Sequence, residues 1–146
     1  MPGKSIGIGI ISYGYMGKVH SLCYREMPFY YHLKIPLRLV GVATPSRSSQ
    51  ERAVREAGFE FATSNPEELL ARPDIDVIDI CSPTYLHEEY VCRAAAAGKA
   101  IYIEKPLAHT LAAARRAYLA VNRNGVRTGM AFEYRFAPAL IRAKEF

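Results

Sequence analysis

The sequence predicts an α/β protein in which a doubly wound parallel sheet forms a single domain. Short apolar segments alternate along the chain with longer amphipathic ones, a pattern typical of strands joined by helices. The apolar segments are nearly continuous, as expected of parallel strands that helices cover on both faces. The chain has 146 residues, of which 50% are apolar, so its length and composition suit one domain with a substantial core.

The first half of the chain is predicted to contain three strands and three helices. The strands are expected at residues 5–11, 37–43 and 60–62. A helix over residues 15–27, followed by an extended loop at 28–32, and a second helix over 48–58 join them. Asn65, followed by Pro66 and two glutamates, is typical of an N-cap, a first-turn proline and an acidic first turn, so a short helix begins there.

The second half repeats the alternation. The strands are expected at residues 76–81, 100–103 and 127–132. Helices over residues 84–97 and 110–124 are expected to end at Gly98 and Gly125, because glycine adopts the left-handed conformation that closes a helix.

A further amphipathic helix is predicted to begin at Pro138 and to run over residues 138–146. It carries apolar residues, Phe146 among them, and no capping residue follows it. We therefore expect the domain to occupy residues 1–137 and residues 138–146 to begin a linker helix toward a missing C-terminal domain. The alternative is a terminal helix docked on the same domain.

Charge and cysteine content exclude several classes of protein. The formal net charge is +5, from 19 Lys+Arg against 14 Asp+Glu, but the basic residues are spread along the chain and often adjoin acids, so no nucleic-acid partner is expected. No apolar run approaches the roughly 20 residues of a membrane-spanning helix, so no membrane partner is expected. Three scattered cysteines form neither a disulfide framework nor a metal pattern, which predicts no metal site and a reducing, cytoplasmic location.

The turn after the first strand contains a variant of the dinucleotide-binding fingerprint GxGxxG. The middle glycine of that motif lets the backbone approach a pyrophosphate, and the last lets the helix pack closely on the sheet. A serine replaces the first glycine here. The residues predicted to bind the cofactor at this turn are Ser12, Tyr13, Gly14, Tyr15, Met16 and Gly17. The alternative is a glycine-rich turn that binds no ligand.

The end of the second strand is expected to contact the adenosine ribose of the cofactor. A carboxylate there favours NAD, whereas an arginine accommodates the 2′-phosphate of NADP. This segment contains no carboxylate but holds Thr44, Ser46 and Arg47, which predicts NADP as the preferred cofactor, with NAD possible. The alternative is that Arg47 is an ordinary surface arginine at the start of a helix.

Two further segments follow the carboxyl ends of strands, where open α/β sheets bind ligands. The predicted cofactor-binding residues are Cys81, Ser82, Pro83, Leu86 and His87 in the first segment and Glu104 and Lys105 in the second. Lys105 is also the predicted catalytic residue, because a lysine beside the nicotinamide polarises a carbonyl or hydroxyl. The alternative is an ion-paired lysine at a strand end.

These segments, taken in order, resemble the N-terminal domain of the Gfo/Idh/MocA oxidoreductase family over nearly the whole chain. The matching segments are residues 14–17 with His20, residues 76–83 with His87, residues 95–99 leading to 104–108, and residues 135–138. Ser12 and Glu133 depart from the family pattern, which usually has glycine and asparagine there.

The resemblance implies a Rossmann-fold domain of an NAD(P)-dependent dehydrogenase that transfers hydride between nicotinamide and a sugar, polyol or related compound. It implies that Lys105 lies at the active site, that His20 packs beneath the phosphate turn and that His87 orients groups near the cofactor. The acid–base histidine would belong to a second α+β domain, absent here, which would also mediate any homo-oligomer. We therefore expect this chain alone to be inactive. The alternatives are a non-catalytic nucleotide-binding module and a regulatory or oligomerisation remnant that binds no nucleotide.

Overall fold

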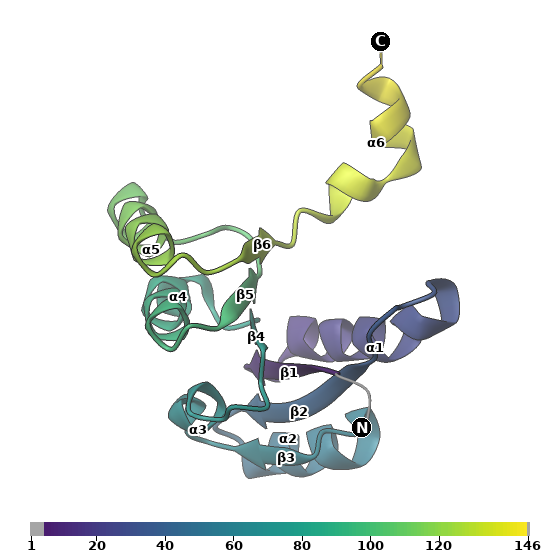
Figure 1. Ribbon diagram of the computed structural model, residues 1–146, viewed down its shortest axis with the longest axis vertical. Coiled ribbons are helices and arrows are strands. Elements are labelled where there is room, and N and C mark those ends of the chain that lie inside the picture. The colour runs from purple at the N-terminus through teal and green to yellow at the C-terminus, as the bar shows by residue number, and fades with distance from the viewer. Residues whose placement is uncertain (1–4, 146) are drawn as a thin grey trace.

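A computed structural model describes residues 5–145 as one six-stranded sheet flanked by helices (Figure 1). All strand pairs are parallel, and the strand order is β3-β2-β1-β4-β5-β6. The strands are β1 (Ile6–Ile11), β2 (Leu37–Ala43), β3 (Phe61–Thr63), β4 (Val77–Ile80), β5 (Ala100–Ile103) and β6 (Thr128–Met130). The predicted doubly wound parallel sheet is confirmed.

The helices are α1 (Tyr15–Tyr30), α2 (Arg47–Arg52), α3 (Pro66–Leu70), α4 (His87–Ala96), α5 (Leu111–Asn124) and α6 (Pro138–Ala143). Helices α1 to α5 lie between the strands as expected, and α6 follows the last strand. A π-helical turn (Ala53–Ala57) continues α2, a 3₁₀ turn (Thr84–Leu86) precedes α4, and another (Glu133–Phe136) precedes α6.

Local sequence signals set several helix ends. The Asn65 side chain accepts a hydrogen bond from the Glu67 amide at 3.1 Å, as an N-cap residue does. Thr110 caps α5 in the same way through the Ala113 amide at 3.1 Å. Glycines with positive φ close the helical segments at the predicted positions, Gly58, Gly98 and Gly125.

The strand order reverses between β1 and β4, which positions the site. From β1 the chain moves through α1 to β2 and then to β3, whereas from β4 it moves in the opposite direction through α4 and α5. Because such crossovers are right-handed, α1 and α2 cover one face of the sheet and α4 and α5 the other. Ile11 pairs with Ile80, so the turns that follow β1 and β4 lie side by side. This is where open α/β sheets bind ligands.

The prediction for residues 28–32 is wrong in part. The helix α1 continues through Pro28 to Tyr30, rather than ending at residue 27 before an extended loop. A proline lacks one N–H donor, and near the end of a helix this loss is small because the Tyr31 amide still reaches the Met27 carbonyl at 2.9 Å. Phe29 is 86% exposed, so the aromatic residues here are not part of the core.

Helix α6 projects away from the sheet (Figure 1) and contains no buried residue. Leu140 and Ile141 are about half exposed on it. The described residues of α6 therefore do not form a helix that packs on the sheet domain. Phe146 lies outside the described residues. Among the residues that the structure describes, no helix is long and apolar enough to cross a membrane.

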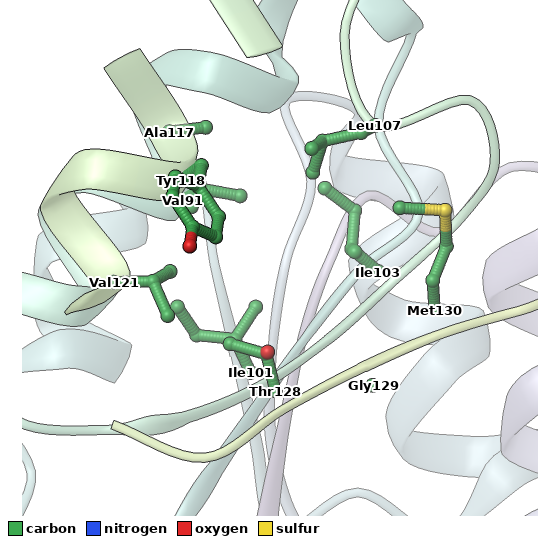
Figure 2. A pocket seen from close by; sticks show the side chains of 10 residues that line it. All are labelled: Val91, Ile101, Ile103, Leu107, Ala117, Tyr118, Val121, Thr128, Gly129 and Met130. Carbon is green, nitrogen blue, oxygen red and sulfur yellow. The ribbon is translucent and has the colours of Figure 1, made fainter. Parts of the chain in front are cut away.

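The sheet is hollowed on both faces. On the α4–α5 face, a cavity of about 180 Å³ lies between these helices and β5–β6, and Figure 2 shows that its lining side chains are almost all apolar. On the α1 face, an open groove of about 770 Å³ runs beside α1 and is bordered by His20 and Glu104. The residues that line the smaller cavity include no charged side chain, which makes it a weaker candidate for a dinucleotide site than the carboxyl edge of the sheet.

Candidate functional site

The turn after β1 contains a serine in a glycine-like conformation. Ser12 has φ 81°, which makes it the one non-glycine residue with positive φ in the described part of the chain. This left-handed conformation costs a residue with a Cβ about 1 kcal/mol or more. Its amide donates to the Ala43 carbonyl at 2.8 Å, which joins the turn to the end of β2. Ser12 thus adopts a left-handed backbone conformation of the kind that glycine adopts most easily, at the position where the fingerprint has its first glycine.

The two glycines of the turn differ in their surroundings. A Cβ added at Gly17 would overlap the carbonyl oxygen of Ser12 and lie 3.1 Å from the carbonyl carbon, so the start of α1 packs directly on the turn. A Cβ added at Gly14 would have only the Ser12 hydroxyl within 4 Å, at 3.8 Å. Gly14 therefore leaves an open space at the end of the helix, of the kind that a pyrophosphate needs.

The first turn of α1 has free backbone amides. Gly14 is the N-cap residue, no side chain caps it, and the first turn holds no acidic residue. The helix is 16 residues long, so its dipole leaves a partial positive charge at this end. Tyr15 is exposed there, whereas the Tyr13 side chain is buried against Phe59 with 6.0 Å between the ring centres. The groups that this turn offers to a ligand are therefore backbone amides rather than the Tyr13 side chain.

The end of β2 lies beside this turn. Thr44 is buried, and its carbonyl accepts a hydrogen bond from Gln50 at 2.7 Å. Ser46 caps α2 through the Ser49 amide. The Arg47 side chain is 91% exposed and contacts Glu51 at 3.2 Å, a surface pair that solvent screens.

The segment after β4 places the remaining predicted residues at the same edge. Ser82 Oγ is buried and, within the described residues, has no hydrogen-bond partner. Pro83 is exposed and Leu86 is half-buried. His87 is buried, and its ring nitrogens face the carbonyl oxygens of Ser82 at 2.9 Å and Pro106 at 2.8 Å. His87 thus links the segment after β4 to the segment after β5.

The segment after β5 separates two adjacent charges. Lys105 is exposed, and its amide donates to Glu104 Oε2 at 3.0 Å. Glu104 is 7% exposed, and its Oε1 lies 3.1 Å from Nε2 of His20. The carboxylate therefore faces the interior, while the Lys105 side chain is exposed. That the residues after β1, β2, β4 and β5 contact a dinucleotide remains a prediction.

A buried polar cluster beneath the turn was only partly predicted, since Asp79 and Tyr24 were missed. Asp79 is 0% exposed, and its Oδ2 lies 2.8 Å from His20 Nδ1 and accepts from the Tyr24 hydroxyl at 3.0 Å. Cys81 Sγ lies 3.3 Å from the same ring nitrogen. The signal in the sequence was an aspartate inside an otherwise apolar strand, because a buried carboxylate needs partners.

The titration of this cluster follows from burial and charge. Burial disfavours the imidazolium of His20, but hydrogen bonds and charges from Asp79 and Glu104 outweigh it, so the pKa of His20 is raised. Burial and the Asp79 carboxylate raise the pKa of Tyr24 and of Cys81, which keeps both groups protonated. Atoms of His20, Asp79 and Cys81 lie within 4.8 Å of one another, but the 2.8 Å between His20 Nδ1 and Asp79 Oδ2 is a direct hydrogen bond, so the structure shows these two side chains as hydrogen-bond partners rather than as metal ligands.

Comparison with known proteins identifies a related family. The family described as "Oxidoreductase family, NAD-binding Rossmann fold" matches residues 6–132 of the chain. Levoglucosan dehydrogenase of Pseudarthrobacter phenanthrenivorans is 38% identical over 146 residues, which cover 98% of this chain and 37% of the relative. The scyllo-inositol 2-dehydrogenase (NAD(+)) of Bacillus subtilis is 37% identical over 121 residues, covering 79% of this chain and 35% of the relative.

The structural comparison agrees. A structure of levoglucosan dehydrogenase in complex with NADH and levoglucosan has a TM-score of 0.91 and 37% identity, with 97% of this chain and 39% of that chain covered. The chain thus spans little more than a third of the length of these relatives.

Proposed function

The chain belongs to the oxidoreductase family with the NAD-binding Rossmann fold, and on this premise we propose that it is the cofactor-binding domain of a sugar or polyol dehydrogenase. One observation carries the proposal. The turn after β1 combines a close contact at Gly17, an open space at Gly14 and free amides at the start of α1. That combination suits the pyrophosphate of a dinucleotide.

The residues present fit the cofactor along the carboxyl edge of the sheet. The amides of the first turn of α1 would hold the pyrophosphate, and the end of β2 would hold the adenosine ribose. The segment after β4, with the unpartnered hydroxyl of Ser82, and Lys105 would lie on the nicotinamide side. When bound, the nicotinamide supplies or accepts the hydride.

The preference for NADP over NAD is a further part of the proposal. The scyllo-inositol 2-dehydrogenase of Bacillus subtilis carries NAD(+) in its name, and the levoglucosan dehydrogenase structure is a complex with NADH, and neither dinucleotide has the 2′-phosphate. In this chain, no carboxylate lies between Ala43 and Glu51, and the exposed Arg47 adjoins the ribose position. An arginine there neutralises the 2′-phosphate.

Lys105 is the residue that we expect to act on the substrate. Its side chain is exposed at the end of β5, and its ammonium group would polarise the reacting oxygen. The relatives extend well beyond the matched region, and we propose that the longer protein supplies the group that transfers the proton. This chain alone would then bind the cofactor without turnover.

The free cysteines Cys23, Cys81 and Cys92 support a reducing, cytoplasmic location.

The experiment is a calorimetric titration of the 146-residue chain with NADPH and, separately, with NADH. We expect both to bind, with NADPH binding more tightly, and Arg47→Ala to remove the difference. Arg123→Ala, in the last turn of α5, is the matched control and should change neither affinity. Equal or tighter binding of NADH would refute the NADP preference. If a folded chain binds neither, the cofactor-domain proposal fails.

The catalytic role of Lys105 is tested in the longer protein. Lys105→Met should lower kcat by about 100-fold or more, a typical contribution of acid–base assistance, while the affinity for the dinucleotide stays unchanged. Unchanged kcat would refute the role of Lys105. A longer protein that binds a dinucleotide but oxidises no sugar or polyol would favour a non-catalytic nucleotide-binding module.

A further inference from the structure

We propose that His20 is a positioning residue that clamps Glu104, and through it the backbone of Lys105, beneath the nucleotide turn. The clamp itself is independent of the proposed function, but the importance of placing Lys105 rests on that function. His20 lies three residues after Gly17 in α1, so the clamp joins the helix that would hold the pyrophosphate to the segment that carries the lysine.

The geometry forms a continuous chain of contacts. His20 Nδ1 lies 2.8 Å from Asp79 Oδ2, and His20 Nε2 lies 3.1 Å from Glu104 Oε1. The other oxygen of Glu104 accepts the Lys105 amide at 3.0 Å. One carboxylate therefore contacts the histidine ring with one oxygen and the lysine backbone with the other. A change at the ring is transmitted to Lys105 through a single side chain.

Hydrogen-bond chemistry selects the protonated form of His20. Both ring nitrogens face oxygens of ionisable carboxyl groups, and an ionised carboxylate only accepts. A neutral imidazole has one N–H, whereas the imidazolium has two and donates to both. Asp79 and Glu104 are 0% and 7% exposed, so the imidazolium is also the positive charge that compensates two buried carboxylates.

The other groups around His20 do not compete for this role. The Tyr24 hydroxyl donates to Asp79 at 3.0 Å, and the Cys81 sulfur lies 3.3 Å from Nδ1. Burial and the neighbouring carboxylates raise the pKa of both groups, so neither supplies a second negative charge. The Tyr102 ring packs on the histidine with 5.7 Å between ring centres. These contacts leave the two carboxylates as the groups that determine the protonation of the ring.

The segment around Lys105 is held from its other side as well. His87, on α4, contacts the carbonyl oxygen of Pro106 at 2.8 Å. The residues before and after Lys105 are thus each attached to a buried histidine from a different helix, while the lysine side chain stays exposed. This arrangement fixes the backbone at Lys105 and leaves its ammonium group available.

The first test is a pH titration of the ¹⁵N-labelled chain, without nucleotide, followed by NMR. We expect two ring N–H signals for His20 below its pKa, and we expect the Lys105 amide resonance to shift with the same midpoint as the His20 ring. The exposed loop residue His32 provides the control, since His32→Asn should leave the pH profile of the Lys105 amide unchanged. A neutral His20 throughout, or a Lys105 amide that ignores the His20 midpoint, would overturn the proposal.

Variants provide the second test. Glu104→Gln keeps the side-chain shape but removes a charge that raises the pKa of His20, so that pKa should fall. His20→Asn should weaken NADH binding about fivefold or more, whereas His32→Asn should leave it unchanged. Thermal unfolding checks that each variant is folded, and the Glu104→Gln titration keeps the proposal testable if His20→Asn is not. An unshifted His20 pKa in Glu104→Gln would overturn the clamp.

The two proposals fail in different ways. If the wild-type chain binds no dinucleotide but the Lys105 amide still follows His20, the clamp stands and the proposed function fails. If the chain binds NADH and the Lys105 amide does not follow His20, the clamp fails and the proposed function stands.

Discussion

The two glycines of the turn provide a test that separates folding from binding. In Gly17→Ala, the new methyl group would overlap the Ser12 carbonyl, so helix and turn must separate by about 1 Å, well beyond what a packed backbone absorbs without cost. Overpacking of this kind destabilises by about 1–3 kcal/mol. For a chain of this size, we expect the midpoint of thermal unfolding to fall by about 5–10 °C.

The matched variant is Gly14→Ala. Its methyl group would have only the Ser12 hydroxyl nearby, at 3.8 Å, which is an ordinary contact, and φ at Gly14 is −75°. We expect stability to change by less than about 1 kcal/mol. The methyl group would, however, occupy the open space that we assign to the pyrophosphate, so NADH affinity should fall about tenfold, or about 1.4 kcal/mol.

Calorimetric titration with NADH and thermal unfolding of both variants make the comparison. A Gly14→Ala variant that binds NADH like the wild type would refute the assignment of the pyrophosphate to this turn. A Gly17→Ala variant of unchanged stability would refute the close contact between α1 and Ser12.

Three further predictions concern the turn and the cluster beneath it. Ser12→Gly relieves the left-handed conformation at φ 81° and should raise stability by about 1 kcal/mol, less the entropy that glycine adds to the unfolded chain; a lower unfolding midpoint would contradict this. Asp79→Asn leaves the buried His20 imidazolium with one carboxylate and should destabilise by about 3 kcal/mol in urea unfolding; a loss below about 1 kcal/mol would show that the pair is dispensable. Because the pKa of His20 is raised on folding, its contribution to stability is fully present below its unfolded value and is lost as pH rises through the folded pKa. Unfolding free energy should therefore decrease over that window in the wild type and not in His20→Asn, as urea titrations at several pH values would measure.

The architecture could be predicted because its determinants are local. The apolar runs of β2 and β5 have the bounds expected from the sequence. Asn65 and Thr110 cap the beginnings of α3 and α5, and Gly125 closes α5, through contacts within a few residues. The end of α1 was misplaced because residues 28–32 were predicted to form an extended loop. A proline near the last turn removes one hydrogen bond, and the following residues continue the helix.

The site was predicted as a set of positions but not as a set of contacts. Fingerprint matching located Ser12 and Gly14 between β1 and α1 and Gly17 in the first turn of α1, since that motif is a local backbone pattern, while the binding of a cofactor there stays a prediction. It gave no means of knowing that Tyr13 packs inward on Phe59 while its neighbour Gly14 stays open. Residues adjacent in a turn point in different directions, and only the path of the backbone decides which of them faces a ligand.

The buried cluster depends on contacts that no local pattern encodes. His20 meets Asp79 and Glu104 across 59 and 84 residues of sequence, because the strand order places β1, β4 and β5 side by side. What the sequence does hold is an aspartate in the middle of an apolar parallel strand, which is too costly to bury unless a donor meets it. Once the order of the strands is known, donors can be sought on the adjacent helix α1, where His20 and Tyr24 both contact Asp79. An acid inside a central parallel strand therefore predicts a polar partner on the adjacent helix, and here that partner links the nucleotide turn to the segment that carries Lys105.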